Sequence, residues 1–205
     1  MGDPELKDVE SHLLDQSTRR DRLLKDSRDV IGSCSRAIVA VHSGNTAEAR
    51  SGVAKAKRLL VALRKDGTGQ LARYLTSPEA EFVEASAVLA LAGGRRLPSR
   101  ESLGVSPEAY VLGLLDTVGE LKRLVLDSIK DGELERAKRY FGNMERLYAA
   151  CSPLAVYDHV LSGGRRKIDV ARMLVEDVRG LLTEEVRRET LIDSMDRVYR
   201  KLGRS

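Results

Sequence analysis

The stretch of sequence that decides the fold is AEFVEASAVLALA, residues 80–92, which is apolar except at Glu81, Glu84 and Ser86. An apolar run of this length without strand-like alternation favours a helix that is buried on almost all sides. Glu84 shares one helical stripe with Val88 and Leu91, so it is not expected simply to face solvent. A buried carboxylate is costly unless it is paired, protonated or bound to a cation. The stretch therefore indicates either an internal salt bridge or a functional site, and we favour the site.

A second acidic pair, Asp116 and Glu120, lies further along the chain in a segment that also has helical spacing. Glu81 and Glu84 are three residues apart and the second pair is four apart, so each pair projects from one face of its helix. Two such helices packed antiparallel would bring four carboxyl groups together, and a divalent cation would neutralise them. An all-carboxylate site favours Mg²⁺, or Mn²⁺ in its place, over iron or zinc. Taken alone, Asp116 and Glu120 fit an ordinary solvated helix face equally well.

Apolar residues recur at helical spacing along the whole chain, and no segment alternates like a strand. We expect a helix over 5–42 (one long helix or two collinear ones), a second with Thr46 as its N-cap, and a third opened by Ser77 and Pro78. The remaining expected elements are a loop at 93–106 and helices over 107–130, 133–151, 154–161, 165–182 and 184–202. The fold class is thus all-α, a single-domain bundle of six or seven helices over residues 1–205. Residues 1–6 are expected to be disordered or an addition to the natural sequence.

Composition narrows the class of protein. Hydrophobic residues make up 42% of the 205 residues, but aromatic residues only 4% and Trp is absent, so the core must be aliphatic. Cys34 and Cys151 are far apart and form no CxxC motif, which argues against a disulfide framework or a zinc site and favours two buried thiols. No apolar run reaches the roughly 20 residues that span a bilayer, and no signal peptide opens the chain. We therefore expect a cytoplasmic protein with no membrane partner.

The net charge of +4 alone indicates little about an anionic partner. The positions of the Lys and Arg residues along the chain are more informative. Residues 49–65 contain six Lys and Arg and no acid, and a helix face that keeps such like-charge repulsion usually meets a polyanion. Residues 19–28 are also rich in Arg and Lys, but interleaved acids allow a solvated face with internal salt bridges. The residues predicted to bind nucleic acid are Arg19, Arg20, Arg22, Lys25, Arg28, Lys57, Arg58, Arg64 and Lys65.

Several common catalytic motifs are absent from the sequence. No GxGxxG, GxxxxGK[ST], HExxH or Glu-x-x-His motif occurs. His12, His42 and His159 are isolated, which argues against a two-histidine ribonuclease mechanism.

The sequence resembles a known family in four places. These are residues 21–29 (DRLLKDSRD), 40–44 (AVHSG), 81–85 (EFVEA) and 110–123 (YVLGLLDTVGELKR). The chain resembles the translin and translin-associated factor X (Trax) family, especially its archaeal Trax-like members. The Tyr-x-x-Gly-x-x-Asp-x-x-Gly-Glu-Leu pattern that begins at Tyr110 is the most specific element of this resemblance.

The resemblance implies a seven-helix protomer that assembles into a hollow, octamer-like shell around nucleic acid. Trax subunits are Mg²⁺-dependent endoribonucleases, whereas translin subunits bind RNA or DNA without the catalytic acids. Those acids fall on Glu81, Glu84 and Asp116, with Glu120 next to them. We expect Glu120 to be a further metal ligand or a group that supports the ligands from behind. Because this chain also carries basic segments, the resemblance implies a homo-oligomer that acts without a separate translin partner.

The leading hypothesis is therefore a Mg²⁺-dependent endoribonuclease that cleaves single-stranded or short duplex RNA, with single-stranded DNA as a further ligand. The first alternative is an oligomeric shell that binds single-stranded RNA or DNA without cleaving it. The second is a helical scaffold whose charges serve only solubility.

Overall fold

The computed structural model describes residues 4–202, and this part of the chain is helical with no strand. Its internal contacts divide the chain into two compact units, Met1–Leu114 and Leu115–Ser205, which are described separately below. The boundary lies inside helix α5 (Pro107–Lys130), which continues through it without a break. The all-α class is confirmed, and the single domain stays a prediction.

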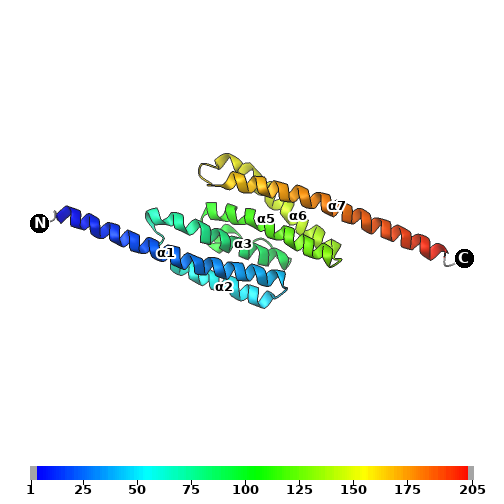
Figure 1. The fold of residues 1–205 in the computed structure, drawn as a ribbon, viewed down its shortest axis with the longest axis horizontal. Helices are drawn as coiled ribbons and strands as arrows, with labels where there is room; N and C mark the ends of the chain where they lie inside the picture. The colour runs from blue at the N-terminus through cyan, green and yellow to red at the C-terminus, as the bar shows by residue number, and fades with distance from the viewer. Residues whose placement is uncertain (1–3, 203–205) are drawn as a thin grey trace. The chain divides into compact units, whose positions relative to one another are not determined.

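The first unit contains α1 (Pro4–His42), α2 (Thr46–Leu63), the 3₁₀ helix η1 (Gly69–Leu75), α3 (Thr76–Ala92), the short α4 (Arg100–Leu103) and the start of α5. Helix α1 packs along α2 and α3, and α2 also contacts α3 (Figure 1). Of the two alternatives for residues 5–42, one long helix or two collinear ones, the structure shows one helix; it begins at Pro4, so residues 4–6 are helical rather than disordered. Residues 1–3 lie outside the described residues.

Helix α3 forms the centre of the first unit. Nearly all of its residues are buried, including Phe82 and Val88 at 1% and 0% exposure, as the apolar run predicts. Helix α5 approaches it closely at Gly113, where an added Cβ would lie 2.7 Å from the Cβ of Val83. The absence of a side chain at Gly113 therefore sets how near the two helices lie.

Two predicted helix starts differ from the structure. The N-cap of α2 is Asn45, whose side-chain oxygen accepts a hydrogen bond from the Glu48 amide at 3.2 Å, and Thr46 is the first helical residue. Helix α3 begins at Thr76, directly after η1, so Ser77 lies inside it and does not cap it. Pro78 is tolerated there because backbone N–H groups in the first turn of a helix have no partner within the helix, so the N–H that proline lacks is not missed.

The second unit contains the rest of α5, α6 (Leu134–Cys151), the 3₁₀ helix η2 (Ser152–Tyr157) and α7 (Gly164–Leu202). Helices α6 and α7 pack together, and η2 contacts both. The break predicted near residue 183 is wrong, because α7 is continuous. The Thr183 hydroxyl donates to the Arg179 carbonyl at 2.7 Å, so it bonds within the helix instead of capping a new one.

Both long helices extend past the other helices of their own unit (Figure 1). Residues 5–15 of α1 and 187–202 of α7 are exposed throughout. Among the helices of residues 4–202, none combines the length and the apolar character needed to cross a lipid bilayer.

Candidate functional site

The first acidic pair lies on α3 and faces α1. Glu81 and Glu84 are half-buried, and both interact electrostatically with Cys34 of α1, whose exposure is 0%. Burial raises the pKa of the Cys34 thiol to about 12, with smaller contributions from the charges of Glu81 and then Glu84. Because both carboxylates act on the same thiol, the structure brings Glu81 and Glu84 together on the α1 side of α3.

A third glutamate of α3 has a different role, which the sequence analysis missed. Glu79 is 5% exposed; its carboxylate accepts a hydrogen bond from Arg64 Nε at 2.9 Å and forms an ion pair with Arg64 Nη2 at 2.8 Å. Its other oxygen accepts the Ser106 amide at 2.9 Å. Glu79 therefore joins the end of α2, the start of α3 and the approach to α5. Arg64, which we predicted to bind nucleic acid, has its guanidinium engaged in this network.

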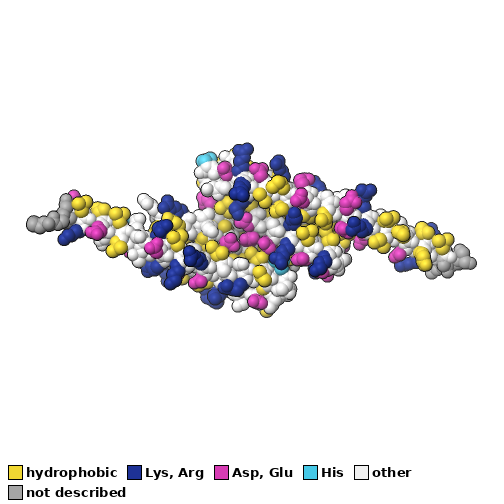
Figure 2. Space-filling model, in the orientation of Figure 1, with side chains coloured by type: hydrophobic (Ala, Val, Ile, Leu, Met, Phe, Trp, Pro, Cys, Tyr) yellow, Lys and Arg dark blue, Asp and Glu magenta, His cyan; other side chains and the backbone are white. Residues whose placement is uncertain are grey.

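The two basic segments predicted from the sequence lie side by side in the α1–α2 hairpin. Arg22 lies 3.7 Å from the Asp66 carboxylate, and Arg19 donates to the Asp66 carbonyl at 2.9 Å and to Thr68 at 2.6 Å. These bonds join the middle of α1 to the segment that follows α2. Five more of the predicted basic residues of this hairpin are exposed: Lys25, Arg28, Lys57, Arg58 and Lys65. Figure 2 shows several Lys and Arg side chains over this part of the molecule.

An aromatic ring also belongs to this basic surface. The Tyr74 hydroxyl accepts hydrogen bonds from Arg20 at 3.1 Å and Arg73 at 3.2 Å, and both guanidinium groups lie within 6 Å of the ring centroid, at 5.7 and 5.1 Å. The bond from Arg20, followed by that from Arg73, lowers the pKa of Tyr74. Aromatic rings among cationic side chains are common where proteins bind single-stranded nucleic acid. The signal in the sequence was Arg73-Tyr74, which lies outside the two basic segments.

The second acidic pair lies on α5 in the second unit. Asp116 and Glu120 are half-buried and one helical turn apart. Asp116 forms an ion pair with Lys167, which lies in the first turn of α7. Two turns along, Lys122 pairs in the same way with Asp177 of α7 at 3.3 Å.

Each unit thus presents two of the four predicted carboxylates. No group of three or more His, Cys, Asp or Glu side chains that could hold a metal ion is found among residues 4–202. Mg²⁺ commonly takes only one or two protein carboxylates and completes its shell with water and substrate phosphate oxygens. The pair of Glu81 and Glu84 fits that mode of binding in its ligand type and spacing.

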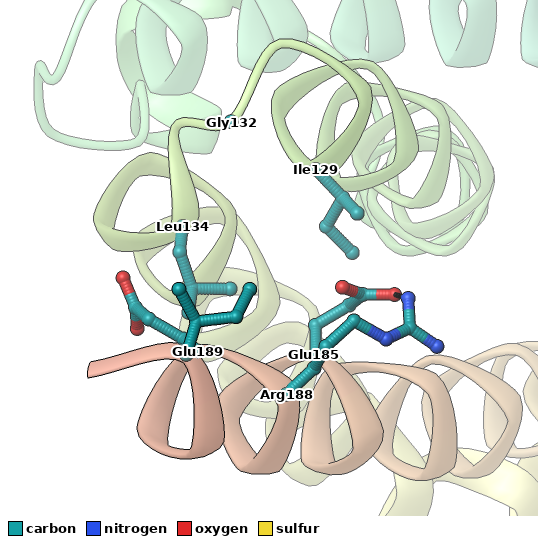
Figure 3. A pocket seen from close by; sticks show the side chains of 7 residues that line it. Ile129, Gly132, Leu134, Glu185, Arg188 and Glu189 are labelled. Atoms are coloured by element: carbon teal, nitrogen blue, oxygen red, sulfur yellow. Dashed lines mark hydrogen bonds and ion pairs between the residues drawn. The ribbon is translucent and has the colours of Figure 1, made fainter. Parts of the chain in front are cut away.

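A pocket of about 200 Å³ in the second unit is apart from the predicted residues. Its apolar side chains are Ile129, Leu134 and Ile192, and Arg188 and Glu185 form an ion pair at its edge at 2.7 Å (Figure 3). None of the predicted site residues lines it.

Comparisons with known proteins agree with this picture. The model of the translin family matches residues 69–181. The uncharacterised protein MJ0175 of Methanocaldococcus jannaschii is 30% identical over 197 residues, which cover 95% of this chain and 88% of that protein.

Three solved structures each match 90% of this chain. AfC3PO in complex with duplex RNA has 26% identity and a TM-score of 0.80, and the match covers 97% of that chain. The crystal structure of AfC3PO has 26% identity, a TM-score of 0.82 and 98% coverage. Apo-NeC3PO, at 19% identity, 99% coverage and a TM-score of 0.78, shows likeness of fold alone. The resemblance read from the sequence is confirmed, and the chain belongs to the translin family.

Proposed function

We propose that the protein is an RNA-binding homo-oligomer that cleaves RNA with the help of Mg²⁺. The observation that carries the proposal is the carboxylate pair Glu81 and Glu84, held on an otherwise buried helix beside the buried thiol of Cys34. Both glutamates project from one face of a helix, and carboxylate oxygens are the ligand type that Mg²⁺ prefers.

The α1–α2 hairpin supports RNA binding. AfC3PO, which shares the fold at 26% identity, has been solved in complex with duplex RNA. In this chain the exposed Lys and Arg residues of the hairpin offer contacts for phosphates, and Tyr74 offers a ring on which a base can stack. Such binding is sensitive to salt and largely blind to sequence. Single-stranded DNA is a further ligand under the same chemistry.

Glu81 and Glu84 would hold Mg²⁺, or Mn²⁺ in its place, and the family resemblance adds Asp116 and Glu120 to the proposed set. When bound, the metal supplies a water of lowered pKa and stabilises negative charge on the phosphate. The role of the protein is to fix the carboxylates: Glu81 and Glu84 project from a helix whose other side chains are almost all buried, so their positions are set by the core. The basic hairpin holds the strand.

The test is cleavage of end-labelled RNA in Mg²⁺ and in EDTA. We expect Mg²⁺-dependent fragments from the wild type, and their loss in Glu81→Gln and Glu84→Gln with RNA binding retained. Glu101→Gln is the control, because that glutamate is exposed and its ion pair, at 3.0 Å, is with the neighbouring Arg100, outside the proposed site. Absence of fragments from the wild type would overturn catalysis and leave an RNA-binding shell. Full activity of both variants would overturn the site.

The proposed assembly is a hollow, octamer-like homo-oligomer. It is supported by the exposed apolar residues near the start of α1 and the end of α7, such as Leu14 at 68% and Tyr199 at 81% exposure (Figure 2). The free thiols of Cys34 and Cys151 fit a reducing compartment, and we propose the cytoplasm. Sizing the protein by light scattering, with and without RNA, tests the assembly.

A further inference from the structure

Another pocket lies wholly within the first unit, at η1 and the starts of α3 and α5. Its volume is about 320 Å³, near the lower end of the roughly 300–1,000 Å³ that ligand pockets occupy. Ala72 and Leu75 of η1 give it an apolar lining, and Thr76 of α3 and Glu108 of α5 are among its polar residues. No acid of the predicted metal site lines it.

The buried acid of this pocket already has its partners. One carboxylate oxygen of Glu79 is bound to the Arg64 guanidinium, and the other accepts the Ser106 amide at 2.9 Å. The Ser106 hydroxyl in turn accepts the Ala109 amide at 3.3 Å. These bonds fix the wall of the pocket, so a ligand would meet groups that are held in place before it binds.

Two polar side chains of the lining are left over. The Glu108 carboxylate and the Thr76 hydroxyl are half-buried, and neither makes a side-chain hydrogen bond or an ion pair with another residue of the described part, 4–202. The pocket therefore offers a charged acceptor and a hydroxyl that can donate. A phosphate fits poorly here, because its charge would meet the carboxylates of both Glu79 and Glu108. A neutral ligand with a hydrogen-bond donor fits better.

Arg73 connects this pocket to the basic surface of the same unit. It lines the pocket, while its guanidinium lies 5.1 Å from the centroid of the Tyr74 ring and donates to the Tyr74 hydroxyl at 3.2 Å. Arg20 of α1 donates to that same hydroxyl. A strand whose phosphates contact these arginines can therefore turn one unpaired base into the pocket.

We propose that this pocket binds an unpaired RNA base that carries an amino group beside an accepting ring nitrogen, which is the edge shared by adenine and cytosine. Glu108 accepts from the amino group, as carboxylates do in base recognition, and the Thr76 hydroxyl donates to the ring nitrogen. Uracil has a carbonyl oxygen in place of the amino group, and that oxygen would face the carboxylate. The inference rests on the proposed RNA binding, to which it adds a base preference.

The experiment measures binding by fluorescence anisotropy in EDTA, so that no metal-dependent cleavage takes place. One probe is a labelled oligouridylate with a single adenosine, and the other has purine riboside in its place, which lacks only the amino group. We expect the wild type to bind the adenosine strand at least about five-fold more tightly, the lower end of what one good contact between a side chain and a base contributes.

Three variants locate the source of this preference. Glu108→Met removes the acceptor and should bind both strands equally. Ala72→Leu fills part of the pocket but keeps every polar group, and it should lose the preference too; it decides the question if Glu108→Met does not fold. Glu101→Met is the matched control, because it removes the same charge from the exposed first turn of α4, outside the pocket. It should keep the preference.

The ratio of the two affinities is the decisive quantity, because a change in net charge alone alters binding of both strands to the same extent. The inference is overturned if the wild type binds the two strands equally, if Glu108→Met keeps the preference, or if Glu101→Met loses it. The proposed function fails in other ways. A wild type that binds neither strand overturns RNA binding as well, and one that binds RNA without cleaving it in Mg²⁺ overturns catalysis alone.

Discussion

The carboxylate of Glu79 shows what a single buried charge does in this protein. Removing it in Glu79→Ala leaves the Arg64 guanidinium and the Ser106 amide without their partner. We expect a loss of about 2–4 kcal/mol in the free energy of unfolding, somewhat below the range for a fully buried pair because Arg64 is 28% exposed.

Urea unfolding followed by circular dichroism measures this loss. Glu101→Ala is the control, because an exposed pair such as that of Glu101 with Arg100 is screened by water and should change the free energy of unfolding much less. Equal unfolding midpoints for the two variants would contradict the role assigned to Glu79.

The two buried thiols make stability depend on alkaline pH. Burial raises the pKa of Cys34 to about 12, with Glu81 and Glu84 adding to the shift, and burial raises the pKa of Cys151 to about 11, both above the 9.0 of an unburied thiol. Above pH 9 the unfolded chain loses thiol protons that the folded protein keeps, so the stabilising contribution is full below pH 9 and declines towards pH 11–12. Each thiol should cost about 1.4 kcal/mol per pH unit in that window.

Comparing unfolding free energies at pH 8.5 and pH 10 isolates this effect. The variant Cys34→Ala/Cys151→Ala should lose less stability than the wild type over the same interval, since other groups titrate equally in both proteins. An identical loss in the two proteins would show that the thiols already titrate near pH 9 in the folded state.

The sequence indicated two of the unusual acids of α3 but missed the third. Glu81 and Glu84 stand out because they interrupt an apolar run, and in the structure the charges of both act on the thiol of Cys34. Glu79 precedes that run and read as an ordinary acid of a first helical turn. Its partner Arg64 is 15 residues away, and only the packing of α2 against α3 brings the two together.

The close packing of α5 against α3 depends on the lack of a side chain at Gly113, and a substitution at this position tests it. A methyl group at this position would lie 2.7 Å from the Cβ of Val83, closer than real side chains approach. We expect Gly113→Ala to destabilise the protein by about 1–3 kcal/mol through overpacking.

Gly180→Ala on α7 is the matched control, because nothing lies within 4 Å of the added methyl group. There the substitution should stabilise the helix by about 0.4–1 kcal/mol. Thermal melts of both variants give the two signs. A stabilising Gly113→Ala would mean that α5 lies further from α3 than described.

Helix extents were predicted well where the chain has strong breaks, and less well where the breaks depend on context. Ser106 caps α5 by accepting the Ala109 amide at 3.3 Å, and α5 ends at Lys130 as the sequence indicates. At Thr183-Glu184-Glu185 the same kind of signal lies inside α7. There, pairs such as Glu185 with Arg188 at 2.7 Å support a continuous helix. A capping residue therefore predicts a possible helix start, and tertiary structure decides whether it is used.

The positive charge of the α1–α2 hairpin is the basis of the proposed RNA binding. Removing Lys57 and Arg58 together should weaken RNA binding and reduce the slope of log affinity against log salt by about 1.4–1.8, since each phosphate contact contributes roughly 0.7–0.9. Lys138→Ala is the control, because Lys138 pairs with Glu135 at 2.6 Å in the second unit. Fluorescence anisotropy at several salt concentrations measures the slope. An unchanged slope would remove these two residues from the RNA-binding surface.

The end of α7 carries an apolar stripe that a single chain leaves exposed. Leu191, Ile192, Met195, Val198, Tyr199 and Leu202 are between 54% and 81% exposed. They recur at helical spacing, so they form one face. A soluble protein seldom leaves a patch of this kind uncovered, and a second copy of the chain would cover it in the proposed homo-oligomer.

Two charges introduced into this stripe should therefore separate the subunits and leave their fold intact. We expect Met195→Glu/Tyr199→Glu to lower the mass measured by light scattering, with an unchanged helical signal in circular dichroism. Val39→Glu replaces a hydrophobic residue of similar exposure, 59%, on α1 and should keep the mass of the wild type. If the double variant keeps its full mass, the contacts that hold the assembly lie elsewhere, and the apolar end of α7 meets a different partner.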